Sequence, residues 1–227
     1  MKDNAMNVIF DMDGVIFDTE RMYLSCCVPA AEKLGLEGIE EVAHECIGLT
    51  EPETNKKLRA FIGDDALLEK FNQETYQIFK ERYEADGLPV KEGAVQLLSY
   101  LEDVGAKTAI ASSTRSHIVE MELRDAGLYD YFDIIVGGDM ASASKPAPDI
   151  FLLAADKLGL TVEKGRITDE CYIIEDSFNG VRAAHAAGAT VLMVPDLLAP
   201  TEEIRALADH VFTSLLEAWE WFENGQC

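Results

Sequence analysis

The sequence predicts an α/β protein with a parallel sheet that helices cover on both faces, interrupted by an all-α insertion. Two observations carry this prediction. Short, continuously apolar runs alternate with segments whose apolar residues recur at helical spacing, which is typical of buried parallel strands joined by helices. By contrast, the stretch from residue 18 to about residue 86 contains only helical patterns, so we expect it to form a separate helical domain.

Each expected strand is a short apolar run that ends abruptly in polar or turn-forming residues. These runs predict strands at residues 8–10, 107–111, 134–136, 172–174 and 190–194. Between them, apolar residues repeat every three or four positions and predict helices over residues 93–104, 115–126 and 146–158, the last beginning near Pro146. In such a sheet, functional side chains gather beyond the carboxyl ends of the strands.

The helical insertion directly follows the first strand. Its patterns cover residues 19–34, 39–47, 52–62 and 65–84, and glycines interrupt them. Pro29 lies inside the first pattern and should kink that helix or divide it in two. We therefore expect an α/β core domain made of residues 1–17 and 88–227, and a helical domain made of residues 18–87.

The chain is strongly acidic, with 42 Asp and Glu against 19 Lys and Arg, a formal charge of −23 over 227 residues. Binding to a nucleic acid or an anionic membrane needs clustered Lys and Arg, so we expect neither partner. The five cysteines lack zinc-ligand spacing, and no apolar run approaches the roughly 20 residues that a membrane-spanning helix needs. We therefore expect a cytoplasmic protein without a disulfide framework or a structural metal.

Polar side chains follow the expected strands and would meet at one edge of the sheet: Asp11 and Asp13, residues 112–115, Lys145, and Glu175 with Asp176. Taken singly, each group also fits an ordinary turn or helix cap. Together, four carboxylates, several hydroxyls and one lysine favour a site for a hard divalent cation and a phosphate. Mg²⁺ fits best, because it binds a few carboxylates, several waters and a phosphate oxygen.

At this edge the sequence resembles the haloacid dehalogenase-like hydrolase superfamily, in particular the branch that contains β-phosphoglucomutase and sugar-phosphate phosphatases. The resemblance spans nearly the whole chain and rests on four motifs in order. They are Phe10-Asp11-Met12-Asp13-Gly14-Val15, with Asp18-Thr19-Glu20 following; Ala111-Ser112-Ser113-Thr114; Ser144-Lys145-Pro146-Ala147-Pro148-Asp149-Ile150-Phe151; and Glu175-Asp176-Ser177-Phe178-Asn179-Gly180. The resemblance implies a Rossmann-like doubly wound parallel sheet with an all-α cap domain inserted after the first strand.

The resemblance also implies a role for each motif residue. Asp11 would be the nucleophile that forms an aspartyl-phosphate, and Asp13 would be the general acid and then the general base. Ser112 and Lys145 would hold and neutralise the phosphoryl oxygens, and Lys145 would help to keep Asp11 ionised. Mg²⁺ would be bound by the Asp11 side chain, the Asp13 backbone carbonyl and Asp176, with Glu175 assisting through water.

We expect the substrate to be a small phosphorylated metabolite that contacts residues of both domains. We expect the protein to be a monomer or a weak dimer. On the core, Ser113, Thr114 and Arg115 offer hydroxyls and N–H groups at a helix start, where anions bind readily. In the cap, substrate contacts are expected from Glu20, Tyr23, Gly48, Thr50 and Glu51.

The sequence leaves several alternatives open. In β-phosphoglucomutases, an arginine and a histidine of the cap occupy the positions of Glu51 and Tyr23, so we prefer simple hydrolysis of the phosphate ester to the mutase reaction. Arg21 is a rival phosphate ligand and keeps the mutase open. The dehalogenases of the superfamily match less well, because they lack the metal and the second aspartate. A catalytically silent binding protein is a further alternative.

Overall fold

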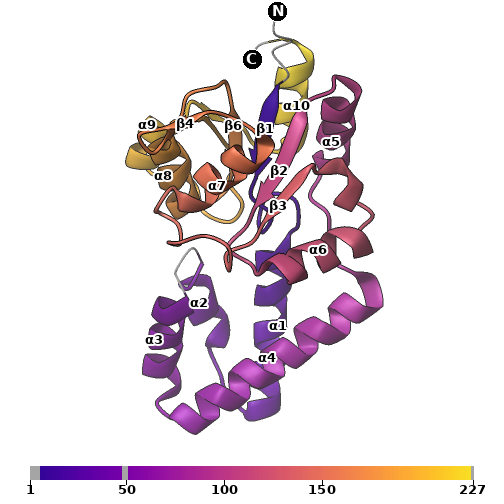
Figure 1. Ribbon diagram of the computed structural model, residues 1–227. Helices are drawn as coiled ribbons and strands as arrows, with labels where there is room; N and C mark the ends of the chain where they lie inside the picture. Colours follow the sequence, from indigo (N-terminus) through magenta and orange to yellow (C-terminus); the bar gives the residue numbers. More distant parts are fainter. Residues whose placement is uncertain (1–5, 48–50, 226–227) are drawn as a thin grey trace, which may run out of the picture. The chain divides into compact units, whose positions relative to one another are not determined.

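The computed structural model describes residues 6–47 and 51–225, and its contacts divide the chain into two compact units. Residues 1–17 and 90–227 form what we call the core unit, and residues 18–89 form the helical unit. Figure 1 shows the core unit with its sheet, and the helical unit. The two linkers run antiparallel: Phe17 bridges Val90, and the Lys91 N–H donates to the Ile16 carbonyl at 2.8 Å.

Six parallel strands form the sheet of the core unit, in the order β3-β2-β1-β6-β7-β8. From β1 the chain proceeds to β2 and β3 on one side, and then crosses to β6 on the other. The carboxyl end of β1 is therefore the point where the strand order reverses, which is where open α/β sheets hold their ligands. The strands are β1 (Asn7–Phe10), β2 (Lys107–Ala111), β3 (Ile134–Val136), β6 (Tyr172–Glu175), β7 (Thr190–Met193) and β8 (His210–Val211).

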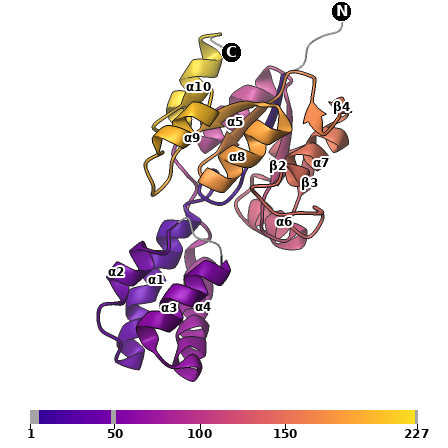
Figure 2. The same cartoon turned by 90° about the vertical axis from the view of Figure 1, so that its left-hand side faces the viewer.

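Alternate residues of each strand point to opposite faces of this sheet, and helices bury both faces. Ile9, Ala111 and Ile173 belong to the core cluster that packs against α7 (Asp149–Leu158), α8 (Phe178–Ala187) and α9 (Glu202–Leu207). On the other face, Tyr172 packs edge-on against Phe222 of α10 (Leu215–Glu223), and α10 packs in turn against α5 (Ala94–Asp103). Figure 2 shows helices on both sides of the sheet, and the predicted fold class is confirmed.

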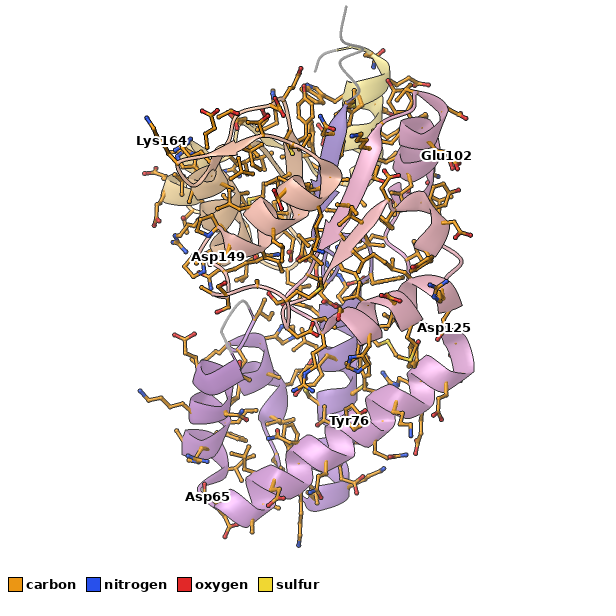
Figure 3. The ribbon with its side chains drawn as sticks, viewed as in Figure 1. Asp65, Tyr76, Glu102, Asp125, Asp149 and Lys164 are labelled. Carbon is orange, nitrogen blue, oxygen red and sulfur yellow. The ribbon has the colours of Figure 1, made fainter. Side chains whose placement is uncertain are left out.

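The sequence patterns missed the shortest elements of the core unit. A hairpin of β4 (Val162–Glu163) and β5 (Arg166–Ile167) turns at Lys164, which is labelled in Figure 3. The expected helix over residues 146–158 begins later, at Asp149, since the first of its residues form the loop that carries Lys145. The core unit also contains α6 (Ser116–Asp125) and a short 3₁₀ helix at Tyr129–Tyr131.

Over residues 18–47 and 51–89, the helical unit contains four helices: α1 (Thr19–Leu34), α2 (Ile39–His44), α3 (Glu51–Ile62) and α4 (Asp65–Asp86). Its apolar centre includes Cys26 and Ala30 of α1 with Leu68 and Phe71 of α4. Pro29 does not divide α1, which runs unbroken through this position, because the lost N–H removes one bond from a helix that is packed along its length. No helix within residues 6–47 and 51–225 has the length and apolarity needed to cross a membrane.

Candidate active site

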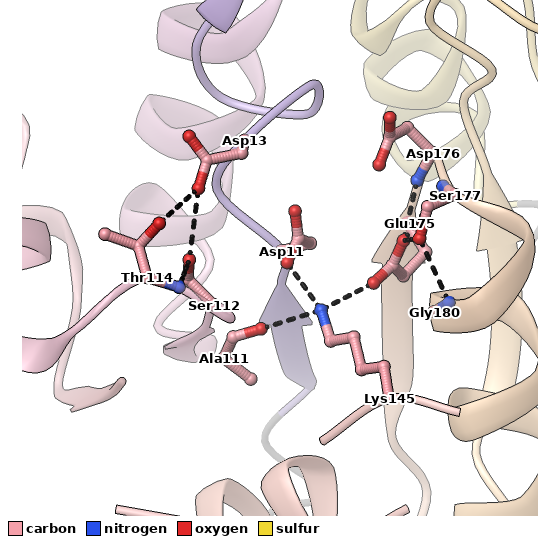
Figure 4. Close-up of polar contacts among 10 residues, drawn as sticks. All are labelled: Asp11, Asp13, Ala111, Ser112, Thr114, Lys145, Glu175, Asp176, Ser177 and Gly180. Atoms are coloured by element: carbon pink, nitrogen blue, oxygen red, sulfur yellow. Dashed lines mark hydrogen bonds and ion pairs between the residues drawn. The ribbon is translucent and has the colours of Figure 1, made fainter. Parts of the chain in front are cut away.

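The carboxyl edge of the sheet brings together side chains from four separate segments of the core unit (Figure 4). Asp11 follows β1, Ser112 follows β2, and Glu175 is the last residue of β6. Lys145 comes from the loop between β3 and α7. Central parallel strands end side by side, and this is why residues 164 positions apart in the sequence, Asp11 and Glu175, share one lysine.

Lys145 is the centre of a buried hydrogen-bond network. Its Nζ donates to Asp11 Oδ1 at 2.5 Å, to Glu175 Oε1 at 2.6 Å and to the Ala111 carbonyl at 3.1 Å. The exposed fractions of the Lys145, Asp11 and Glu175 side chains are 6%, 9% and 0%. All three ammonium protons therefore have acceptors, as a buried lysine requires.

The buried charges shift the pKa values of this pair. Burial raises the pKa of the Asp11 carboxyl from 3.8 to about 8; the Lys145 ammonium lowers it, but the Glu175 and Asp13 carboxylates raise it again. For Lys145, burial opposes the charged form, but the Asp11 and Glu175 carboxylates outweigh burial and raise the pKa of the ammonium. The protein alone thus favours a protonated Asp11 at neutral pH, and a cation at the site would favour the ionised form.

Glu175 also shapes the turn that follows β6. Its Oε2 accepts hydrogen bonds from the Asp176 N–H, the Ser177 N–H and the Ser177 hydroxyl, each at 3.0 Å. Gly180 has to be glycine here, because a Cβ at that position would lie 1.8 Å from Glu175 Oε1. Glu175 therefore orients both Lys145 and the loop that carries Asp176.

Three carboxylates could hold a metal ion at this edge. Asp11, Glu175 and Asp176 each offer an oxygen, and these oxygens lie within 4.8 Å of one another. The turn after Asp11 is packed tightly against them: Gly14 has φ +82°, and a Cβ there would lie 2.3 Å from Asp176 Oδ2. Oxygen donors of this kind suit a hard divalent cation, so the residues present fit such an ion.

Asp13 lies on the opposite side of Asp11 from Lys145 (Figure 4). Its Oδ2 accepts a hydrogen bond from the Thr114 hydroxyl at 2.8 Å and a longer one from the Ser112 hydroxyl at 3.3 Å. Ser112 is fully buried, and Asp13 and Thr114 are partly buried. The two aspartates of the same turn thus have different partners, an ammonium for Asp11 and two hydroxyls for Asp13.

The other expected substrate ligands lie in several places. Ser113 and Arg115 are exposed on the loop before α6, and Glu20 and Tyr23 lie on α1 of the helical unit. Gly48 and Thr50 lie outside the described residues, and Glu51 is described only as the first residue of α3. Sequence reasoning missed the Ala111 carbonyl as a partner of Lys145, because a backbone acceptor has no residue signature.

A second feature that sequence reasoning missed is the pair of glycines after β3. A Cβ on Gly137 would lie 2.1 Å from the Ser116 N, and one on Gly138 would lie 2.2 Å from the Ser113 carbonyl oxygen. The loop that carries Ser112 and Thr114 therefore rests directly on this backbone. Consecutive glycines after a predicted strand are a signal for such a close approach.

Comparisons with known proteins agree with this architecture. The model of the haloacid dehalogenase-like hydrolase family matches residues 8–194. A phosphorylated carbohydrates phosphatase of Thermotoga maritima is 33% identical over 80% of this chain and 81% of its own. Fructose-1-phosphate phosphatase YqaB of Escherichia coli is 30% identical over 83% of this chain and 95% of its own. Among solved structures, a Thermotoga maritima protein provisionally named a β-phosphoglucomutase has 29% identity and a TM-score of 0.79, over 96% of this chain and 99% of its own.

Proposed function

Because the chain belongs to the haloacid dehalogenase-like hydrolase family, we propose that it is a Mg²⁺-dependent phosphatase that hydrolyses a small sugar phosphate through an aspartyl-phosphate. The phosphatase class agrees with the names of its relatives, two of which act on phosphorylated sugars. The single observation that carries the mechanism is the position of Asp11. This carboxylate lies at the strand-order reversal, bonded to a buried ammonium and beside a second aspartate of the same turn.

In the first step, a carboxylate oxygen of Asp11 attacks phosphorus while the bond from phosphorus to the sugar oxygen breaks. Asp13 gives its proton to the departing sugar oxygen, so a neutral alcohol leaves. Lys145 lies where it can neutralise charge on the phosphoryl oxygens, since its Nζ bonds the attacking carboxylate. The Ser112 hydroxyl and the backbone N–H groups of the loop after Ala111 are proposed to hold the remaining oxygens.

In the second step, Asp13 takes a proton from water as the water oxygen attacks phosphorus. The bond between Asp11 and phosphorus breaks, phosphate leaves, and both aspartates return to their starting forms. The net reaction is ester plus water to alcohol plus phosphate. Two displacements by groups fixed in one site replace one difficult hydrolysis in solution.

Mg²⁺ would be held by Asp11, Asp176 and the Asp13 carbonyl, with Glu175 nearby. When bound, it would supply positive charge that favours ionised Asp11 and neutralises the phosphoryl oxygens. Glu175 acts on Lys145 and on the following turn, as its contacts with both indicate.

We further propose that the helical unit is a cap that selects the substrate. This proposal is supported by the position of the helical unit in the chain, where it is inserted between the turn that carries Asp11 and the rest of the core unit. The residues proposed to contact the leaving sugar are those of the first turns of α1 and the segment before α3. A cap that closes excludes water and contacts the part of the substrate that departs.

The test is phosphate release from p-nitrophenyl phosphate and a panel of sugar phosphates, with Mg²⁺ and with EDTA. We expect turnover with Mg²⁺, and a loss of at least about 10³-fold in Asp11→Asn, since removing a covalent nucleophile typically costs that much or more. The matched control is Asp103→Asn at the end of α5, where the same change should leave turnover intact. No turnover across the panel with Mg²⁺, or full turnover in Asp11→Asn, would refute the proposal.

A mutase is the second candidate, favoured by the structural match to the protein provisionally named a β-phosphoglucomutase. Against it stands an acidic residue, Glu51, where the mutases carry a phosphate-binding arginine. The two are distinguished by supplying β-glucose 1-phosphate with a trace of the 1,6-bisphosphate, and measuring glucose 6-phosphate against free phosphate. Free phosphate should dominate, and dominant glucose 6-phosphate would establish the mutase instead.

A further inference from the structure

The Thr114 hydroxyl donates a hydrogen bond to Asp13, the aspartate proposed to act as general acid and base. We infer that Thr114 is a positioning residue, which holds the carboxyl group of Asp13 in place for proton transfer. This inference rests on the proposed function, because it takes Asp13 as the group that protonates the leaving oxygen. It differs from the expectation that Thr114 contacts the substrate.

The geometry is a closed ring of three hydrogen bonds. The Thr114 hydroxyl donates to Asp13 Oδ2 at 2.8 Å, and the Ser112 hydroxyl donates to the same oxygen at 3.3 Å. The Thr114 N–H in turn donates to the Ser112 hydroxyl oxygen at 3.0 Å. Figure 4 shows both hydroxyls on one side of the carboxyl group, so Oδ1 takes no part in the ring. The shorter of the two bonds to Asp13 comes from Thr114.

The backbone of the core unit fixes Thr114 independently of any ligand. The Gly138 N–H donates to the Thr114 carbonyl at 2.8 Å, and the Ser112 N–H donates to the Val136 carbonyl at 3.1 Å. Gly138 leaves no room for a Cβ beside the Ser113 carbonyl, so the loop lies directly on the chain that follows β3. A hydroxyl on a loop held in this way is a fixed reference point for Asp13.

The proposed reaction separates the tasks of the two hydroxyls. A serine hydroxyl has one proton, so when Ser112 donates to a phosphoryl oxygen it no longer donates to Asp13. Thr114 then remains as the donor that orients the Asp13 carboxyl group. Asp13 is on a turn and partly exposed, and without Thr114 it would occupy other rotamers in which Oδ1 is out of reach of the leaving oxygen.

The consequence depends on the leaving group. A poor leaving group needs the proton from Asp13 as its bond to phosphorus breaks, whereas p-nitrophenolate departs readily without it. Phenyl phosphate and p-nitrophenyl phosphate share the same ring and phosphate, so they bind alike and differ mainly in this need. A loss of Asp13 positioning should therefore lower kcat/KM for phenyl phosphate more than for p-nitrophenyl phosphate.

The experiment measures kcat/KM for both substrates, with Mg²⁺, in the wild type, Thr114→Val and Thr114→Ser. In Thr114→Val we expect the ratio of phenyl to p-nitrophenyl phosphate to fall by about tenfold, a part of what general acid catalysis contributes. Thr114→Ser keeps the hydroxyl and should restore the ratio. Ser116→Ala is the matched control: it removes a hydroxyl from the same segment that bonds Asp139 instead, at 3.0 Å, and should leave the ratio unchanged.

The outcomes distinguish this inference from the proposed function. A wild type that hydrolyses neither ester overturns the proposed function. Hydrolysis by the wild type with an unchanged ratio in Thr114→Val, whether both rates fall equally or neither falls, overturns the positioning role alone. If Thr114→Val does not fold, Thr114→Ala removes the same hydroxyl with a smaller side chain, and the same criterion applies to it.

Discussion

Replacing Lys145 by methionine removes the ammonium that lies between two buried carboxylates and leaves a side chain of similar length. The Asp11 and Glu175 side chains are 9% and 0% exposed, so water cannot take over the lost hydrogen bonds without a rearrangement. Removing one partner of a buried ion pair typically costs about 3–5 kcal/mol. For a chain of this size, that loss lowers the melting temperature by about 6–20 °C. Turnover should be lost with it.

The destabilisation of Lys145→Met should depend on pH in a direction that identifies its cause. Lys145 lowers the pKa of Asp11, so the variant has an Asp11 pKa even further above the ordinary value of 3.8. Between 3.8 and the folded-state pKa, the folded protein binds a proton that the unfolded chain does not. The free energy of unfolding of the variant therefore increases as the pH falls. Wild-type Asp11, with a pKa of about 8, gains stability in the same way below that pH, so the deficit of the variant shrinks mainly as the pH falls toward 8 from above and changes little below it.

The assay is thermal unfolding in EDTA at several pH values, with Lys80→Met as the control. Lys80 pairs with Glu84 on the exposed surface of α4, at 3.6 Å, and a pair of this kind contributes at most about 0.5 kcal/mol. If Lys145→Met lowers the melting temperature no more than Lys80→Met does, the buried network does not stabilise the core. If its deficit grows on acidification, the explanation through unpaired carboxylates is wrong.

Two further predictions concern the cation site. Mg²⁺ binding to the wild type, followed by calorimetry, should tighten as the pH rises, because the cation displaces the Asp11 proton. With a pKa of about 8, the apparent association constant increases about 50-fold from pH 6 to pH 8 and then levels off, and a flat profile would contradict this assignment. Gly14→Ala should weaken Mg²⁺ binding, because its Cβ would lie 2.3 Å from Asp176 Oδ2. The control is Gly35→Ala, whose backbone strain, at φ +68°, is comparable to that of Gly14→Ala, but whose Cβ has no atom within 4 Å. This strain should cost about 1–2 kcal/mol of stability and leave Mg²⁺ binding unchanged. Equal losses of Mg²⁺ affinity in the two variants would refute the steric argument.

Much of the fold could be predicted from local patterns. The strands are short apolar runs buried on both faces, and their positions, such as residues 107–111, depend on nothing but local composition. The helix over 94–103 has its apolar residues at helical spacing and was predicted within one residue at each end. Two-residue strands such as β8 carry too little pattern to be recognised, and the start of α7 depends on how a proline-rich loop packs.

For the candidate site, the sequence indicates which residues lie near the strand ends but not which atoms meet. Ser112 illustrates the limit. Its position after a strand predicts a hydroxyl at the sheet edge, yet its hydroxyl donates to Asp13, a partner 99 residues away. The Thr114 hydroxyl also donates to Asp13. No spacing in the sequence relates either residue to Asp13.

The sequence by itself determined the positions of the five longer strands, the all-α insertion and the set of polar side chains at the sheet edge, because these follow from periodicity and from where apolar runs end. Only the tertiary structure decided how the charges pair. Lys145 bonds Asp11 and Glu175 rather than solvent because parallel pairing aligns the ends of β1 and β6 and buries all three side chains. Burial also raises the pKa of Asp11 to about 8, and a desolvation effect of this kind is absent from any local pattern of residues.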